Sequence, residues 1–112
     1  MGGISDLELF PTGEKAVTAG HSGTLAIWDV TTGSMLARLH NALVEPTRIY
    51  DVQVFPDGSR IVALAADKHA TVWHADSGEM LLRLQCEPHW HTVVRVHPSG
   101  EAIITGLSNM RV

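Results

Sequence analysis

Residues 49–84, IYDVQVFPDGSRIVALAADKHATVWHADSGEMLLRL, decide the fold, because they repeat residues 4–39 at an interval of 45 positions without a gap. Twelve of the thirty-six aligned positions are identical, and a third copy runs from near His91 to Val112. A period of about 40–45 residues in strand-like segments is typical of a propeller or a related array of sheets. The sequence therefore predicts an all-β fold with about two and a half repeating units in one region, 1–112, at residues 4–48, 49–90 and 91–112.

Each unit contains strand-like segments in the same order, four in each complete copy. The first segment alternates apolar and polar residues, as in Leu7-Glu8-Leu9, which predicts a strand with two different faces. The second is continuously apolar, as in 61–64, which predicts a strand covered on both faces. Between them a proline precedes a glycine by two residues, a pattern typical of a tight turn. These turn residues are Pro11 and Gly13, Pro56 and Gly58, and Pro98 and Gly100.

The composition excludes several classes of protein. The chain is 45% hydrophobic and 18% charged with a net charge of −4 and no basic run, so neither a nucleic acid nor an anionic membrane is expected as a partner. The longest apolar run is too short to span a membrane, and the N-terminus lacks the pattern of a signal peptide. The single cysteine, Cys86, fits a reducing compartment. We expect a cytoplasmic or nuclear protein.

The candidate chemical motifs are weak. Cys86, His89 and His91 resemble a metal-binding cluster, but no fourth ligand is evident nearby, and a polar loop is the better interpretation. Ser22 lacks the glycine two residues later that a nucleophile elbow needs. Asp6 and Asp51 occupy equivalent repeat positions, which favours a structural or channel-facing role over an acid–base pair. We therefore expect no catalytic residue, no metal and no cofactor.

The repeats resemble those of the WD-repeat β-propeller family. The similarity lies in the Trp28-Asp29 dipeptide, in a glycine five residues after Trp28 and after Trp73, and in Asp67 six residues before Trp73. The resemblance implies a partial propeller of four-stranded antiparallel blades, with both tryptophans in the core. The chain departs from the family at His74, which follows Trp73 where the family has Asp, and at Ser22. Thr18 can supply the hydroxyl that the family places against the tryptophan, whereas Ala63 cannot, so we expect blades held mainly by packing.

The resemblance implies a non-catalytic scaffold that presents loops to partner proteins in a multiprotein complex. The alternative is a recruiting or regulatory propeller of a larger enzyme or signalling protein; a weaker third reading is a propeller enzyme with its site in the channel. The third copy ends before its tryptophan, so we expect the remaining blades of a longer chain as neighbours, or self-association if the short chain is real. Trp90 is a candidate anchor for a partner or a local plug over the gap between blades. The other candidate partner-binding residues are Arg48, Tyr50, Lys68 and His69.

Overall fold

The computed structural model describes residues 4–20, 24–39, 48–66, 68–85, 93–106 and 109–111, and every regular element in these ranges is a β-strand. The first sheet consists of β1 (Ile4–Leu9), β2 (Lys15–Gly20), β3 (Leu25–Asp29) and β4 (Met35–Leu39). The second consists of β5 (Ile49–Val54), β6 (Arg60–Ala65), β7 (His69–His74) and β8 (Met80–Gln85). The third contains β9 (Val94–Val96), β10 (Ala102–Thr105) and β11 (Asn109–Arg111).

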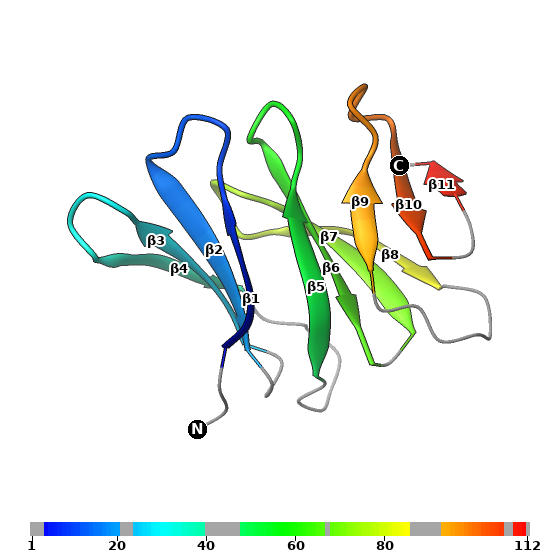
Figure 1. Ribbon diagram of the computed structural model, residues 1–112, viewed down its shortest axis with the longest axis horizontal. Helices are drawn as coiled ribbons and strands as arrows, with labels where there is room; N and C mark the ends of the chain where they lie inside the picture. Colours follow the sequence, from blue (N-terminus) through cyan, green and yellow to red (C-terminus); the bar gives the residue numbers. More distant parts are fainter. Residues whose placement is uncertain are drawn as a thin grey trace.

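Each sheet is antiparallel, and its strands pair in sequence order (Figure 1). The prediction of an all-β chain with four-stranded antiparallel sheets is confirmed for the first two repeats. The described residues contain no helix, and hence none long and apolar enough to cross a membrane.

The hairpin turns have the same geometry in all three sheets. The amide of the turn glycine donates to the carbonyl three residues earlier at 2.8 Å, as from Gly13 to Phe10 and from Gly58 to Phe55. The turn glycines have φ near +75°, a region that side chains with a Cβ rarely adopt. The recurring Pro-x-Gly pattern therefore produces the same turn in each repeat.

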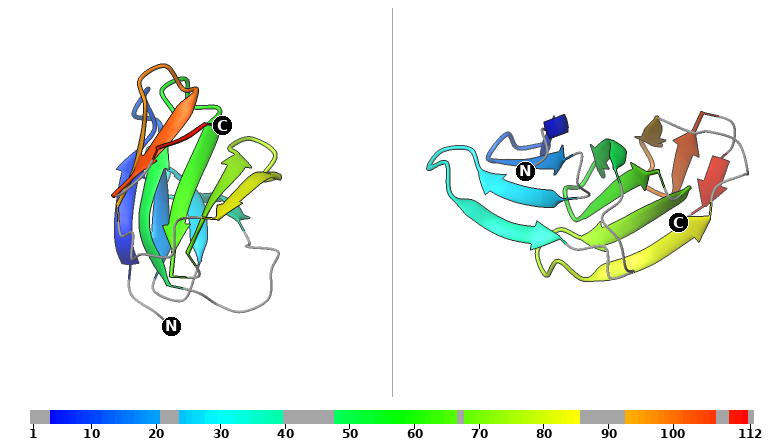
Figure 2. Two further views of the ribbon diagram at one scale, coloured as in Figure 1. Left: turned by 90° about the vertical axis from the view of Figure 1, so that its right-hand side faces the viewer. Right: turned by 90° about the horizontal axis from the view of Figure 1, so that it is seen from below.

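The three sheets lie side by side, with β1, β5 and β9 along one edge and β4 and β8 along the opposite edge (Figure 2). Two hydrophobic clusters fill the spaces between them. Between the first and second sheets, Val17, Ile27, Ile61 and Trp73 are among the buried residues. Phe55 belongs to the cluster that includes residues of the third sheet. Among the described residues the row of sheets stays open at both ends.

The position of a sheet in this row determines which of its predicted core residues are covered. In β6, between two neighbours, residues 61–64 are all buried, as predicted for a strand covered on both faces. In β10, at the end of the row, Ile104 is 40% exposed, and the same prediction is wrong there. Trp73 is 2% exposed, but Trp28 is only half-buried, so the expectation of a core residue is met fully only by Trp73. Within the part of the chain that the structure describes, each deviation lies on a sheet that has a neighbour on one side only.

Candidate functional site: a carboxylate ladder between the sheets

Two aspartates join the neighbouring strands β1, β5 and β9, which are the first strands of the three sheets. We call this arrangement the carboxylate ladder. Asp6 on β1 accepts a hydrogen bond from the amide of Leu7 at 2.9 Å and from the amide of Val52 on β5 at 3.1 Å. Asp51 on β5 accepts from the amide of Val52 at 3.0 Å and from the amide of Val94 on β9 at 2.9 Å. Each carboxylate thus binds the next amide of its own strand with one oxygen and an amide of the following sheet with the other.

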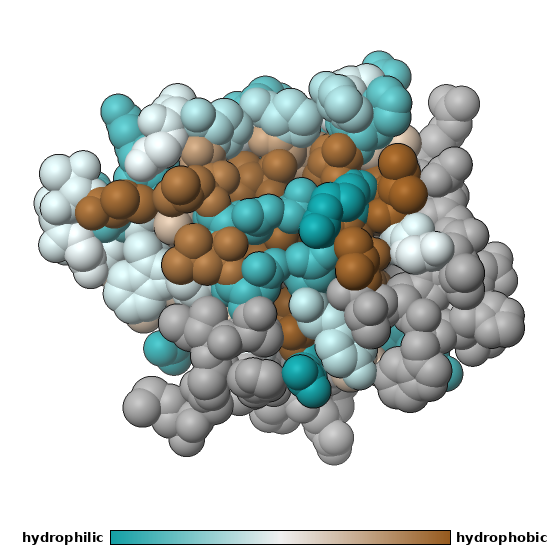
Figure 3. Space-filling view, in the orientation of Figure 1, coloured by the Kyte–Doolittle hydropathy of each residue, from teal (hydrophilic) through white to brown (hydrophobic). Residues whose placement is uncertain are grey.

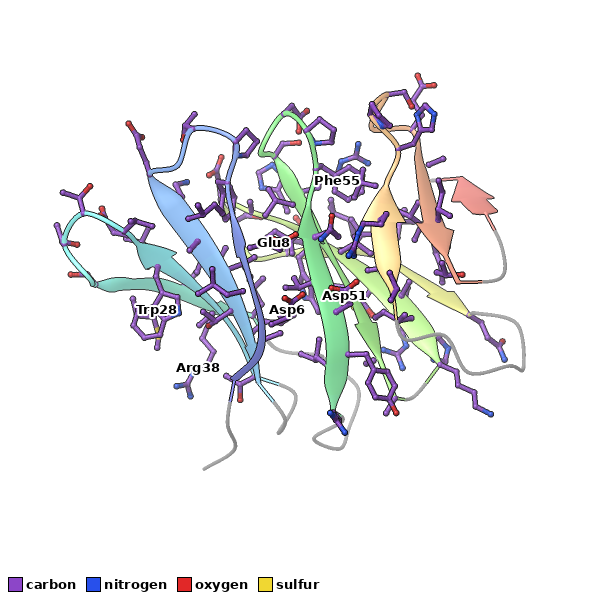
Figure 4. All side chains as sticks on the ribbon, viewed as in Figure 1. Asp6, Glu8, Trp28, Arg38, Asp51 and Phe55 are labelled. Atoms are coloured by element: carbon purple, nitrogen blue, oxygen red, sulfur yellow. The ribbon has the colours of Figure 1, made fainter. Side chains whose placement is uncertain are left out.

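A second set of polar contacts lies beside these bonds. The side-chain Nε2 of Gln53 on β5 donates to the carboxylate of Glu8 on β1. Arg95 on β9 donates to Asp51 at 2.5 Å and to the carbonyl of Val94 at 2.7 Å. Figure 4 shows Asp6 and Glu8 between β1 and β5, and Asp51 between β5 and β9. Strands β1, β5 and β9 are therefore joined by hydrogen bonds, in addition to the two hydrophobic clusters that lie between the sheets.

The two aspartates also interact directly, and their acidities move in opposite directions. Burial, followed by the hydrogen bond with Asp6, raises the pKa of Asp51 to about 6. Burial acts in the same direction on Asp6, but the hydrogen bonds from Asp51 and from two backbone amides outweigh it and lower the pKa of Asp6. The pair therefore keeps one proton, mainly on Asp51, to a higher pH than an ordinary aspartate would.

The geometry suits a structural junction better than an acid–base site. The side chain of Asp51 is 10% exposed, and both of its oxygens accept bonds from amides or from Arg95. A substrate that reached this carboxyl group would have to displace those bonds. No group of three or more His, Cys, Asp or Glu side chains suited to a metal ion occurs in the part of the chain that the structure describes.

Polar side chains also fix the turns and one tryptophan. The carboxylate of Asp29 accepts from the amides of Thr31 and Thr32 at 2.8 and 3.0 Å. In the second sheet the Nδ1 atom of His74 accepts from the two equivalent amides, 76 and 77, at 3.3 Å. The imidazole therefore replaces the carboxylate of Asp29 as the acceptor in this turn.

The structure contains the hydrogen bond between the hydroxyl of Thr18 and a tryptophan that was expected from the sequence. The indole Nε1 of Trp28 donates to the hydroxyl of Thr18 at 2.9 Å. Ala63 occupies the equivalent place in the second sheet and has no hydroxyl to offer. The two sheets therefore differ in how their tryptophans are held.

Four of the predicted partner-binding residues lie at one end of the second sheet. The carbonyl of Arg48 accepts from the amide of Ala66 at 2.8 Å, and its guanidinium lies 5.5 Å from the ring centre of Tyr50. Lys68 has φ +67°, an uncommon value for a residue with a side chain, and His69 pairs with Gln85. The structure thus brings these four residues to one end, opposite the Pro56–Gly58 turn.

The remaining predicted residues fall elsewhere. Trp90, Asp67 and the group Cys86, His89 and His91 lie outside the described residues, as does Ser22. The carboxylate ladder was not predicted, although aspartate recurs two residues after the isoleucine that begins β1 and β5 and directly before Leu7 and Val52, and this recurrence was the signal for it. No family model matches the chain, and a search of curated protein sequences finds no significant match.

Proposed function

We propose that this chain is a section of a WD-repeat-like β-propeller that acts as a non-catalytic platform for partner proteins. The observation that carries the proposal is the recurrence of one sheet, with the same turn geometry and the same polar bonds to its neighbour, at the repeat interval. A row of sheets packed in this way is a stiff support from which loops project at both ends.

The end of the second sheet that carries Arg48, Tyr50, Lys68 and His69 is the proposed partner-binding end. Arg48 and Lys68 are exposed, and their cationic groups combine with the partly exposed ring of Tyr50. Arginine and tyrosine are enriched in the residues that contribute most to binding at protein interfaces. An acidic segment with an apolar residue is the kind of ligand that such a surface suits.

Comparative capture of binding proteins tests the proposal. The chain, the double variant Arg48→Glu and Lys68→Glu, and the control Glu14→Lys, an exposed residue in the turn at the opposite end of the neighbouring first sheet, would be immobilised and exposed to one cell extract. Support would be a set of proteins kept by the chain and by the control but lost by the double variant, with unchanged thermal unfolding. If all three retain the same set, the proposed end is wrong; if none retains any protein, the platform itself is in doubt.

A further inference from the structure

The two oxygens of the Asp51 carboxyl group face different neighbours. Oδ1 accepts from the amide of Val52 at 3.0 Å, and the same amide donates to Oδ2 of Asp6 at 3.1 Å, so the two aspartates converge on one N–H group. Oδ2 of Asp51 accepts from the amide of Val94 at 2.9 Å and from Arg95 at 2.5 Å, both on β9. Oδ1 therefore lies at the contact between β1 and β5, which we call the first junction. Oδ2 lies at the contact between β5 and β9, which we call the second junction.

The first junction needs a proton. Two ionised carboxylates in contact repel each other, and the single N–H group of Val52 cannot neutralise both, whereas a proton on one of them turns the contact into a hydrogen bond. Asp6 also accepts from the amide of Leu7 at 2.9 Å, which favours its ionised form and leaves the proton on Asp51. The first junction is therefore attractive when Asp51 is protonated and repulsive when it is ionised.

The second junction responds in the opposite direction. The guanidinium of Arg95 stays charged throughout the range in which a carboxyl group titrates, and both it and the amide of Val94 bond more strongly to a carboxylate than to a neutral carboxyl group. Val93 stands where the other repeats have Asp6 and Asp51, so β9 places no carboxylate of its own at this position. Opening this junction returns water to Asp51, which favours its ionised form, but the two donors on β9 outweigh this effect. Loss of the proton therefore tightens the second junction.

The other charged groups on the strands that pack against β5 are engaged elsewhere in the described ranges. Glu8 on β1 is bonded by a side-chain amide of β5. Lys15 on β2 lies 3.4 Å from Asp76, and Arg60 on β6 donates to the carbonyl of Gly100 at 2.8 Å. On the face shown in Figure 3, hydrophilic residues form a band over β5 between hydrophobic areas. The aspartate pair lies under this band, where it can exchange its proton with water.

We propose that the proton of the aspartate pair is a switch between the two junctions. It tightens the first junction and loosens the second, and its loss reverses both effects. The switch concerns contacts between sheets of this chain and does not depend on the proposed platform function, so either can fail alone.

Amide hydrogen exchange followed by NMR between pH 4.5 and 7.5 tests the switch, because the amides of Val52 and Val94 each report on one junction. Dividing the exchange rate of an unfolded chain at the same pH by the measured rate gives a protection factor, which removes the ordinary pH dependence of exchange. As the pH rises, we expect the protection factor of Val52 to fall about tenfold and that of Val94 to rise about threefold to tenfold. One unit of difference in pKa corresponds to a tenfold change in such an opening equilibrium.

Three variants assign the two responses. Asp51→Asn should abolish both, because its side chain is neutral at every pH; responses that persist in this variant would come from histidines and would refute the proposal. Arg95→Met should leave the fall at Val52 but remove the rise at Val94, because the cation produces that rise. Arg38→Met, at an exposed position on β4, is the matched control and should change neither response.

The original chain alone can overturn the switch, even if a variant fails to fold. Protection factors of Val52 and Val94 that change in the same direction would show that the pH acts on the whole fold and not on one junction against the other. Protection factors that stay constant at both amides would show that the pair does not control either junction.

Discussion

Raising the pH from 4 to 7 should weaken the folded state through one carboxyl group, that of Asp51. Burial and the hydrogen bond with Asp6 raise its pKa from 3.8 to about 6. When folding raises the pKa of a group, that group stabilises the folded state fully at a pH below its pKa in the unfolded state. The stabilisation is lost as the pH rises through its pKa in the folded state. Integrated over this window, the linkage relation gives a loss of about 2 kcal/mol in the free energy of unfolding. Asp6 has a lowered pKa, so its own contribution is lost only at more acidic pH.

The assay is urea unfolding of the chain and of Asp51→Asn at pH 4, 5, 6 and 7. The amide resembles the protonated carboxyl, because it can accept from the amide of Val94 and donate to Asp6. The difference in unfolding free energy between the two proteins should therefore change by about 2 kcal/mol across the range, in favour of the variant as the pH rises. Asp76→Asn, which removes the exposed ion pair with Lys15 at 3.4 Å and leaves Asp6 and Asp51 in place, is the control and should not abolish the change of about 2 kcal/mol.

Parallel pH profiles of the chain and Asp51→Asn would refute this reasoning. A direct titration of the Asp51 carboxyl carbon by NMR provides an independent check. A midpoint near the ordinary value of an aspartate would show that the junction does not hold the proton.

Four further predictions concern stability. Trp73→Ala should lower the free energy of unfolding by about 3–5 kcal/mol, because this side chain is buried between two sheets, and Trp28→Ala should lower it by less. Chemical denaturation measures both losses, and equal losses would contradict the difference in burial. Thr18→Val should cost about 1 kcal/mol by removing the acceptor of the indole while keeping the shape, and unchanged stability would show that the bond contributes nothing. His74→Asp should preserve stability, because a carboxylate can accept from the same two amides as Asp29 does in the first sheet, whereas His74→Ala should cost about 1 kcal/mol. Equal thermal unfolding of the two variants would show that this side chain does not cap the turn. Gly58→Ala should destabilise by about 1–2 kcal/mol, because its φ of +75° places a Cβ in a strained conformation, and a neutral effect in urea unfolding would argue against that backbone geometry.

The sheets and their turns could be predicted because both can be read directly from the sequence. The repeat interval gives the number and order of the strands, and proline and glycine at fixed places mark the turns. Pro56 and Gly58, for example, specify a hairpin whatever lies beside it. The exposure of Leu7 and Ile104 could not be predicted in this way, because it depends on whether a neighbouring sheet is present.

The candidate site was predicted less well than the fold. Asp6 and Asp51 were expected to be structural or channel-facing, and their bonds to amides of the following sheet fit a structural role. Their interaction with each other depends on how adjacent sheets are offset. Sequence spacing contains no such information. The replacement of Asp29 by His74 appeared as a departure from the pattern, yet the structure shows that an imidazole nitrogen meets the same two amides.

The direction of the carboxylate ladder has a consequence for the order of synthesis. In both junctions the earlier sheet supplies the acceptor and the later sheet supplies the amide, across 46 and 43 residues of sequence. A ribosome releases the earlier sheet first, and domains generally fold as units from the N-terminal side during synthesis. If the sheets form in the order in which they leave the ribosome, β5 and then β9 each meet an aspartate that is already in place, and this bond can set the alignment of the strand before the next repeat leaves the exit tunnel.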